Sequence, residues 1–475
     1  MQRFHTGPVA LLFFAAGCAS SKAGPPGADA SDATIADGSS TADASPGGET
    51  PVEGSLEVNY DGAVSGSIVH PCTLPGSIVR TATGTTLVPG GEGPDGQALP
   101  DVSYIEVPTG FCVHYFGNVG NARQIRFAPS GEAFVASPTG PTTSEGSNGQ
   151  SAVLVLPDDN NDGVADGNLT FMGGLVYTQG LLFTGGYLYY QDAATIRRVP
   201  YTPGQRASPG ASELVADIGA NHHQDAVHWP KALDIADDGT IYVGNGGSQD
   251  DQCVKPPWPF LGGILTLDGT PGGSIVARGL RNPIAIRCAR GHNQCFALEL
   301  AKDYSASEAG REKLLPIRQG DDWGFPCCAT EGVPYADAPY RTDAGAPMLA
   351  DCSAIAPATD SFLIGDTPFG LDFETGLWPG SWSGRVFIAN HGAAGTWTGA
   401  RLVAIAMDPT TGLPMPGTNY MGGADMGALV DFATGWDDGQ NDHGRPTAVA
   451  FSADGRLFLT NDATGDIVWI APSSL

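Results

Sequence analysis

The sequence predicts an all-β fold, a six-bladed β-propeller with long loop insertions on one face, preceded by a disordered N-terminal tether. A short apolar run, a tight polar turn and a second apolar run recur six times, which is the pattern of an antiparallel hairpin. The 475-residue chain has 67 glycines and 37 prolines, as many short strands with tight turns require. One hairpin cannot bury its own face, so six of them are expected to stack as blades.

Each hairpin is expected to belong to one blade, because the repeats recur at roughly fifty residues or more with no good helical pattern between them. The best helical candidate, Ser305 to Leu315, is short. The hairpins span, in chain order, residues 125–137, 181–192, 231–247, 284–300, 370–392 and 447–462.

Three further segments complete the predicted propeller domain, which we assign to residues 55–475. Residues 55–120 carry strand-like runs that are expected to close the propeller or to pack against it. Insertions at 323–364 and 408–436 interrupt the spacing of the repeats. Such insertions are expected on the loop face, where the binding sites of propellers lie.

The N-terminus has the features of an export signal. Residues 1–18 combine an early arginine, a short apolar run and a small-residue end, which is typical of a signal peptide. Cys18 follows small residues, as in the cleavage box of bacterial lipoproteins, although ordinary cleavage is the alternative. Residues 19–54 consist mainly of Ala, Gly, Ser, Asp and Pro and are expected to form a flexible, disordered linker. We therefore expect an exported protein, either lipid-anchored to the bacterial outer membrane through Cys18 alone or periplasmic.

Charge and cysteine content narrow the class of protein. The formal net charge of −28 disfavours nucleic acid as a partner, because phosphates need a basic face. Without Cys18, eight of the nine cysteines remain, and an even number in an exported protein favours disulfides over metal binding. Cys288 and Cys295 are expected to bond across the fourth hairpin. Cys327 and Cys328 bond either to each other or to distant cysteines such as Cys352.

Three basic residues precede the first strand of three different hairpins. His228 precedes the third hairpin, Arg281 the fourth and Arg445 the sixth. Around a propeller axis these positions would converge on one basic pocket that suits an anionic ligand. There a histidine can act as a general base, and a guanidinium can bind carboxylates or stabilise a developing oxyanion. A structural hydrogen bond and a salt bridge between blades are the alternatives.

An acidic segment after the first hairpin has the spacing of the first part of a calcium loop. Its side-chain ligands are expected to be Asp158, Asn160, Asp162 and Asp166, which would converge on one structural ion. Leu169 stands where an EF-hand has its closing acidic ligand. An acidic β-turn is the alternative.

Residues 120–475 resemble the glucose/sorbosone dehydrogenase family, whose members are six-bladed propellers that use pyrroloquinoline quinone (PQQ) and calcium. The order of the matching segments along the chain is as specific as their content. They are DNNDGVAD (159–166), VHWPKALDIADDGTIYVGNGG (227–247), ARGLRNP (277–283), QGDDWGFP (319–326), VFIANHG (386–392), GARLVAI (399–405), DFATGW (431–436) and GRPTAVAFSADGRLFLTND (444–462).

The resemblance implies a role for each site residue. His228 matches the base that removes the proton of the substrate hydroxyl. Arg281 and Asn282 match groups that hold and polarise the quinone, Arg445 an arginine that binds its carboxylates, and Arg401 a nearby cation. The implied reaction is base-assisted hydride transfer from a sugar, polyol or sugar aldehyde to PQQ in the presence of calcium. The electron acceptor is unknown.

Two other functions remain open. In the family, the segment after the fourth hairpin is acidic and helps to hold the cofactor calcium, but here it contains Lys302, Arg311 and Lys313. This difference favours a non-catalytic lipoprotein propeller that binds carbohydrate or a partner protein. A calcium-dependent lactonase-like hydrolase is the third hypothesis. It would require several carboxylates at the axis, where the sequence places mainly arginine and histidine.

Overall fold

The computed structural model describes most of the chain from residue 70 onwards. The described ranges are 70–138, 151–218, 228–247, 253, 262–270, 272–301, 311–330, 332–335, 340–341, 347–348, 351–356, 358–363, 365–393, 396–415, 429–439 and 443–475. The predicted signal peptide, lipid anchor and linker lie outside them and stay predictions. Within these ranges, no helix has the length and apolar character needed to cross a membrane.

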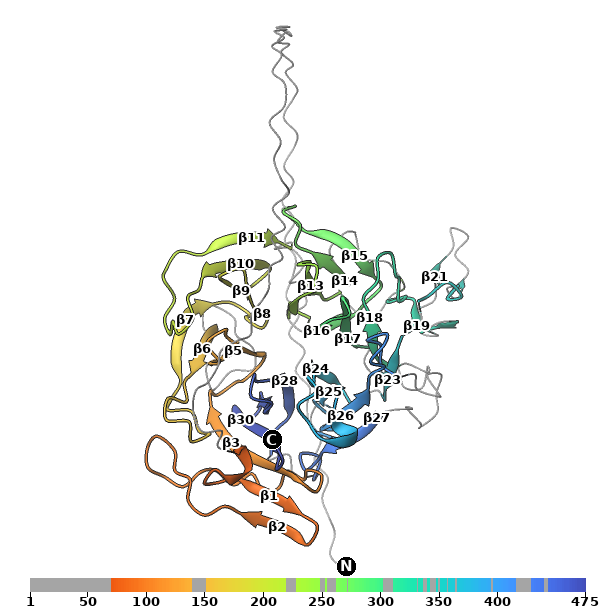
Figure 1. The fold of residues 1–475 in the computed structure, drawn as a ribbon. Coiled ribbons are helices and arrows are strands. Elements are labelled where there is room, and N and C mark those ends of the chain that lie inside the picture. Colours follow the sequence, from red (N-terminus) through yellow and green to blue (C-terminus); the bar gives the residue numbers. More distant parts are fainter. Residues whose placement is uncertain are drawn as a thin grey trace, which may run out of the picture. The chain divides into compact units, whose positions relative to one another are not determined.

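The fold is an all-β, six-bladed propeller, as the hairpin repeats predict (Figure 1). The first three blades are four-stranded antiparallel sheets. Their strands are β4 (Ile125–Phe127), β5 (Ala133–Ser137), β6 (Ser151–Leu156) and β7 (Leu169–Leu175); β8 (Leu181–Thr184), β9 (Tyr187–Asp192), β10 (Thr195–Pro200) and β11 (Glu213–Asp217); and β12 (Leu233–Ile235), β13 (Ile241–Asn245), β14 (Gly263–Thr266) and β15 (Ser274–Arg278).

The fourth and fifth blades repeat this arrangement, and the sixth is extended. The fourth consists of β16 (Asn282–Ala289), β17 (Gln294–Leu300), β18 (Glu312–Pro316) and β23 (Asp360–Phe362), and the fifth of β24 (Pro368–Phe373), β25 (Arg385–Asn390), β26 (Arg401–Ala406) and β27 (Leu429–Ala433). The sixth has the order β2 (Gly84–Leu87), β1 (Ile78–Thr81), β3 (Phe111–Asn118), β30 (Asp466–Pro472), β29 (Leu457–Asn461) and β28 (Pro446–Phe451).

All six predicted hairpins form the first two strands of a blade. Glycines close the tight turns, because these turns need a backbone conformation that other residues rarely adopt. Gly239 (φ +87°) and Gly455 (φ +85°) are examples, and each donates its N–H to the carbonyl oxygen three residues earlier. The turn chemistry of the sequence thus positions the paired strands of every blade.

A strand from the N-terminal side of the domain closes the ring. β3 pairs with β30 along its length, so chain segments that are more than 340 residues apart share the sixth blade. The expectation that residues 55–120 help to close the propeller is therefore confirmed for 111–118. The run 104–108 forms no strand, and only Glu106 makes an isolated bridge to Thr434.

Over the part that the structure describes, the best helical candidate, 305–315, is not a helix. Residues 312–316 form strand β18, and all five are buried between β17 and β23. The sheet environment therefore overrides the helical preference of this polar, leucine-containing segment.

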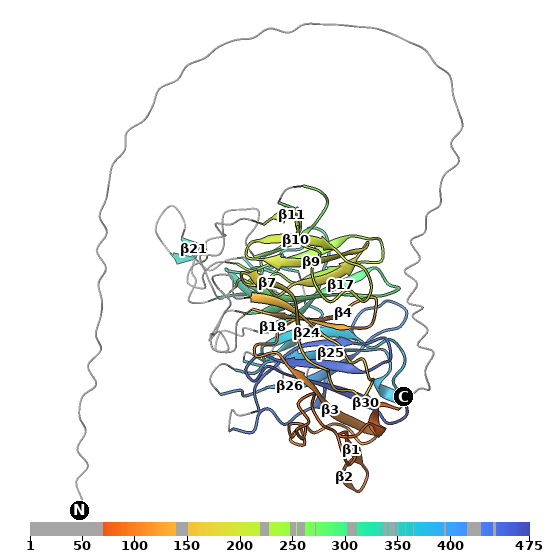
Figure 2. The same cartoon turned by 90° about the vertical axis from the view of Figure 1, so that its left-hand side faces the viewer.

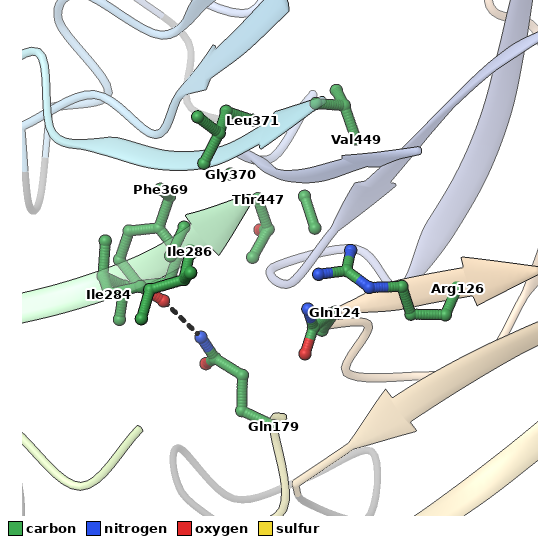
Figure 3. Close-up of a pocket in the computed structure, with 12 residues that line it drawn as sticks. Gln124, Arg126, Gln179, Ile284, Ile286, Phe369, Gly370, Leu371, Thr447 and Val449 are labelled. Atoms are coloured by element: carbon green, nitrogen blue, oxygen red, sulfur yellow. Dashed lines mark hydrogen bonds between the residues drawn. The ribbon is translucent and has the colours of Figure 1, made fainter. Parts of the chain in front are cut away.

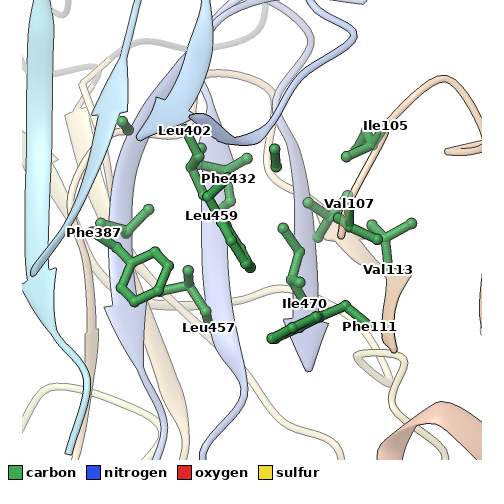
Figure 4. Close-up of a cluster of buried hydrophobic side chains, with 14 of the residues drawn as sticks. Ile105, Val107, Phe111, Val113, Phe387, Leu402, Phe432, Leu457, Leu459 and Ile470 are labelled. Atoms are coloured by element: carbon green, nitrogen blue, oxygen red, sulfur yellow. The ribbon is translucent and has the colours of Figure 1, made fainter. Parts of the chain in front are cut away.

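Apolar side chains fill the space between neighbouring blades. In the cluster between the fifth and sixth blades, Phe387 and Phe432 face Leu457, Leu459 and Ile470 (Figure 4). The inward residues of each strand alternate with outward ones, as period-two patterning requires. This packing makes neighbouring blades rigid supports for the loops at their ends.

Four disulfides use all eight cysteines after Cys18. Cys288 bonds to Cys295 across directly paired positions of β16 and β17, with a Cα separation of 3.8 Å, as predicted. The other bonds are Cys72–Cys112, Cys253–Cys327 and Cys328–Cys352. The adjacent cysteines thus have different distant partners.

The insertion after β18 contains two small strand pairs. They are β19 (Cys328–Thr330) with β20 (Val333–Pro334), and β21 (Tyr340–Arg341) with β22 (Pro347–Met348). β21 lies to one side of the blades (Figure 2). Short 3₁₀ turns occur at η1 (Pro71–Thr73) and η4 (Gly380–Trp382).

Candidate functional site

The structure connects the three predicted basic residues at one end of the propeller. His228 precedes β12, Arg281 directly precedes β16 and Arg445 directly precedes β28. These strands are the first strands of three blades, so residues before them occupy equivalent positions. A continuous series of contacts, described below, joins all three.

His228 is held by the loop that follows β13. Its ring Nδ1 lies 3.0 Å from the carbonyl oxygen of Gly247, and the residue is 5% exposed. A carbonyl oxygen only accepts hydrogen bonds, so this contact makes Nδ1 the donor and leaves Nε2 as the basic nitrogen of the neutral ring. The close approach also requires glycine, since a Cβ on Gly246 would lie 2.6 Å from the carbonyl oxygen of His228.

Gly247 links His228 to Arg281. The N–H of Gly247 donates to the carbonyl oxygen of Arg281 over 2.5 Å. Arg281 is buried, and its own N–H donates over 2.9 Å to Oε1 of Glu299 on the adjacent strand. The backbone of Arg281 is therefore fixed on both sides.

A buried ion pair completes this anchor. Nζ of Lys313 lies 2.8 Å from Oε2 of Glu299, and the two side chains are 3% and 1% exposed. Lys313 belongs to the segment that departs from the resembled family, and the structure gives it a positioning role. Asn282 is also buried, and its Oδ1 has no hydrogen-bond partner among the described residues.

Arg445 lies at the same end, between backbone carbonyls and an aromatic ring. Its Nε donates to the carbonyl oxygen of His391 (3.0 Å) and its Nη2 to that of Gly392 (2.6 Å). The guanidinium lies 4.5 Å from the centre of the Trp397 ring. Burial lowers the pKa of Arg445 to about 10, so it remains a cation at neutral pH.

His391, Asp462 and Arg123 connect Arg445 to His228. Nε2 of His391 lies 2.8 Å from Oδ1 of Asp462, and Nε of Arg123 lies 3.4 Å from Oδ2 of the same carboxylate. The Arg123 guanidinium lies 5.7 Å from the ring of Trp229, the residue after His228. His228, Arg281 and Arg445 therefore share one end of the propeller, as predicted.

These connecting residues were not predicted from the sequence. Arg123 stands two residues before the first hairpin, Asp462 ends the last one and His391 follows β25, so their positions at the ends of the predicted hairpins are the signal that could have identified them. Lys231, at the start of the third hairpin, was also missed. Its Nζ donates to the Trp229 carbonyl oxygen (2.9 Å), and burial lowers its pKa to about 7.

Electrostatics fix the charges of the connecting group. Burial lowers the pKa of His391 to about 4 despite the neighbouring Asp462, so this imidazole is neutral at pH 7. Burial alone would raise the pKa of Asp462, but His391, Arg123 and Arg445 together hold it well below its usual range. Asp462 is therefore an anion that compensates one of two arginines.

Arg401 has carboxylate partners, and one of them, Asp366, accepts the Gly392 N–H through its carbonyl oxygen. It donates from both terminal nitrogens to Asp366 (3.1 Å each) and from Nε to Asp431 (2.8 Å). These bonds tie β26 to β27 and to the loop before β24. The predicted cofactor contact of Arg401 stays a prediction and would have to be made beside two existing ion pairs.

The predicted calcium loop folds around its own backbone amides. Asp158 accepts the N–H groups of Asp162 (3.1 Å) and Gly163 (3.2 Å), Asn160 accepts that of Asp162, and Asp166 accepts that of Asp159. Burial raises the pKa of Asp158 to about 6. In the described ranges, no group of three or more His, Cys, Asp or Glu side chains is arranged to hold a metal. Calcium at this loop therefore stays a prediction.

Among the described residues, the axis of the propeller has a small cavity. Gln124, Gln179, Ile284, Phe369 and Thr447, from strands or strand entrances of five blades, are among its lining residues (Figure 3). Its volume of about 20 Å³ has room for roughly one water. A ligand as large as a quinone must therefore bind at the end of the channel rather than in it.

Buried charges occupy the channel farther along the same strands. Arg287 pairs with Asp372 (2.6 Å) and Asp234 (3.6 Å), while Arg126 donates to the Leu233 carbonyl oxygen (3.3 Å). Arg287 thus joins side chains of three blades, and Arg126 joins the backbone of one of them to a fourth blade. They link the blades at this level.

The end with His228 fits an anionic quinone better than it fits a metal. Arg281 and Arg445 supply the cations that carboxylates bind, and the buried Oδ1 of Asn282 has no hydrogen-bond partner among the described residues. Among the described residues, no group of three or more His, Cys, Asp or Glu side chains that could hold a metal lies there. The side chains at this end could therefore hold the quinone, whereas no described residues are assigned to hold its calcium.

Comparisons with known proteins agree with this fold. No protein-family model and no curated protein sequence matches the chain. The solved structures that resemble it include the calcium structure of a Trichoderma reesei protein of Carbohydrate-Active Enzymes Family AA12 (TM-score 0.63, 17% identity, 78% of this chain and 98% of that one), the holo form of the PQQ domain of pyranose dehydrogenase from Coprinopsis cinerea (0.61, 16%, 78% and 98%) and the apo form of a soluble aldose sugar dehydrogenase from Escherichia coli (0.52, 12%, 76% and 99%). At these identities the likeness is one of fold: this chain has the propeller of a family AA12 protein, a PQQ domain and a sugar dehydrogenase.

Proposed function

We propose that this protein is a quinoprotein oxidoreductase that uses PQQ and calcium to oxidise a sugar, polyol or sugar aldehyde. The observation that carries the proposal is the convergence of His228, Arg281 and Arg445 at one end of a propeller. The proteins of similar fold, which include a PQQ domain and a sugar dehydrogenase, support the same function. Fold alone does not determine function, so the proposal depends on these side chains.

His228 is the proposed general base. The hydrogen bond from Nδ1 to Gly247 orients the ring and leaves Nε2 to accept the proton of a substrate hydroxyl. The glycines at 246 and 247 and the bond to Arg281 hold this loop in place. Because Nε2 is itself buried, a substrate hydroxyl would reach it only after neighbouring groups shift.

The arginines are the proposed cofactor contacts. Arg445 would bind a carboxylate, and Arg281 with Asn282 would contact the polar edge of the quinone. When bound, PQQ would supply an electrophilic carbonyl for hydride transfer. The chain contributes orientation and compensating positive charge, and the Glu299–Lys313 pair keeps Arg281 at its position.

The activity test uses the purified protein reconstituted with PQQ and calcium. Reduction of an artificial electron-accepting dye is followed over a panel of sugars, polyols and aldehydes. We expect turnover in the wild type and loss of turnover, with quinone binding retained, in His228→Ala. A wild type that binds the quinone but oxidises no member of the panel would instead favour the non-catalytic carbohydrate-binding propeller.

The cellular context is part of the proposal. Export, a lipid anchor at Cys18 and an outer-membrane or periplasmic location suit an enzyme that oxidises external sugars and passes electrons to an acceptor nearby. Radiolabelled lipid incorporation that is lost in Cys18→Ala would test the anchor. Unchanged labelling in the variant would contradict it.

A further inference from the structure

Arg123 is a buried cation with few polar partners. Its side chain is 9% exposed, and its guanidinium makes no hydrogen bond within the described part of the chain. Its contacts are the 3.4 Å ion pair with Asp462 and the ring faces of Trp229 (5.7 Å) and Phe369 (5.0 Å). A planar group with five donors is thus held between two rings at the site.

Arg123 lies next to residues that line the axial cavity. Phe369 and Gln124 line the channel cavity (Figure 3), and Arg123 packs over the first and precedes the second in sequence. Trp229 is the direct neighbour of His228. The Arg123 guanidinium therefore contacts both a cavity-lining ring and the ring of the residue that follows His228.

Arg123 and Arg445 leave this group with an excess of positive charge. Both arginines influence Asp462 and His391, so the four side chains lie within electrostatic range of each other. His391 is neutral, which leaves two cations and the single anion Asp462. A buried excess charge is costly unless an anion compensates it.

We propose that Arg123 and Arg445 form a carboxylate-binding subsite beside the axial cavity, in which Asp462 competes with the ligand for the arginines. The ligand class is a planar carboxylate, which the two-nitrogen edge of a guanidinium binds in bidentate fashion. Two sources share this chemistry: a carboxylate of the quinone, and the carboxylate of an acidic sugar such as a uronic acid. Only the first source rests on the proposed function.

The experiment measures calorimetric affinities of the full chain for PQQ, glucuronate and the neutral counterpart glucose. Arg123→Gln removes the guanidinium, Asp462→Asn removes the internal competitor, and Arg80→Gln on β1 is the control, since Arg80 is exposed and binds Thr85. Thermal melts confirm that each variant is folded.

We expect Arg123→Gln to weaken carboxylate binding roughly tenfold to a hundredfold, the value of a lost charge-assisted hydrogen bond. Asp462→Asn should strengthen it, and Arg80→Gln should leave it unchanged. If the affinity for glucuronate, measured in the absence of the quinone, depends on Arg123, the subsite binds acidic sugars. If only the affinity for PQQ depends on Arg123, the subsite binds the cofactor.

Wild-type affinity of Arg123→Gln for both carboxylates would overturn the inference, as would a wild type that binds neither of them. If Arg123→Gln does not fold, Asp462→Asn decides, and no gain in affinity contradicts the proposal. A wild type that binds glucuronate through Arg123 but does not bind PQQ refutes the proposed function and retains the subsite.

Discussion

Removal of the Lys313 ammonium should destabilise the propeller strongly. Lys313 and Glu299 form a 2.8 Å ion pair with side chains that are 3% and 1% exposed, and Oε1 of Glu299 also accepts the Arg281 N–H. Lys313→Met leaves the Glu299 carboxylate buried without its cation. Loss of one partner of a buried pair costs about 3–5 kcal/mol.

The size of the effect on melting follows from the size of the domain. An unfolding entropy of about 2.1 cal/mol/K per residue gives roughly 0.8 kcal/mol/K for this propeller, so Tm should fall by about 4–6 °C. The double variant Lys313→Met/Glu299→Gln removes both charges, and the glutamine oxygen can still accept the Arg281 N–H. It should therefore be less destabilised than the single variant.

Denaturant and thermal unfolding of the wild type, the single variant and the double variant test this prediction. Arg290→Met is the control, because its ion pair with Asp237 is exposed and 4.0 Å long, and its loss should change stability by less than about 1 kcal/mol. A double variant as unstable as Lys313→Met, or a single variant no less stable than the control, would refute the anchoring role of this pair.

Two further effects on stability are expected. Burial, reinforced by Asp366, raises the pKa of Glu312 from 4.5 to about 8, so the folded state binds this proton more tightly and the free energy of unfolding falls as pH rises from about 4.5 to 8. Glu312→Gln should remove that part of the decline between pH 5 and 8, and parallel wild-type and variant profiles in denaturant titrations would contradict it. Cys72–Cys112 spans 40 residues and Cys288–Cys295 only 7, so chain entropy predicts losses of about 4 and about 2.5 kcal/mol on replacement of each pair by serine, and the reverse order would count against this reasoning.

The fold was predictable because its information is local. Each hairpin has its own alternating strands and turn glycine, such as Gly455, so six repeats predict six blades. Pairing between residues that are far apart in the sequence was harder to predict. That β3 pairs with β30, or that Cys327 and Cys328 have different partners, depends on the closed ring and not on nearby residues. Residues 312–315 have some helical preference, but they form part of strand β18 because their buried neighbours in the sheet override it.

The position of the candidate site was predictable from the sequence, but the contacts that connect its residues were less so. Equivalent places before inner strands identified His228, Arg281 and Arg445. The contacts of Arg123 and Asp462 join the first and last hairpins, and only ring closure brings these residues together. In the sequence, Lys313 is a basic residue in a segment that is acidic in the resembled family. Its buried ion pair with Glu299 explains why a lysine stands there.

The central claim is that the end of the propeller with His228, Arg281 and Arg445 binds an anionic quinone. An absorbance titration of the purified protein with PQQ, with and without calcium, tests it most directly. We predict a saturable change at one quinone per chain that is retained in His228→Ala and weakened at least about tenfold in Arg445→Ala. Absence of a saturable change in the wild type, or equal affinity in Arg445→Ala, would contradict the claim.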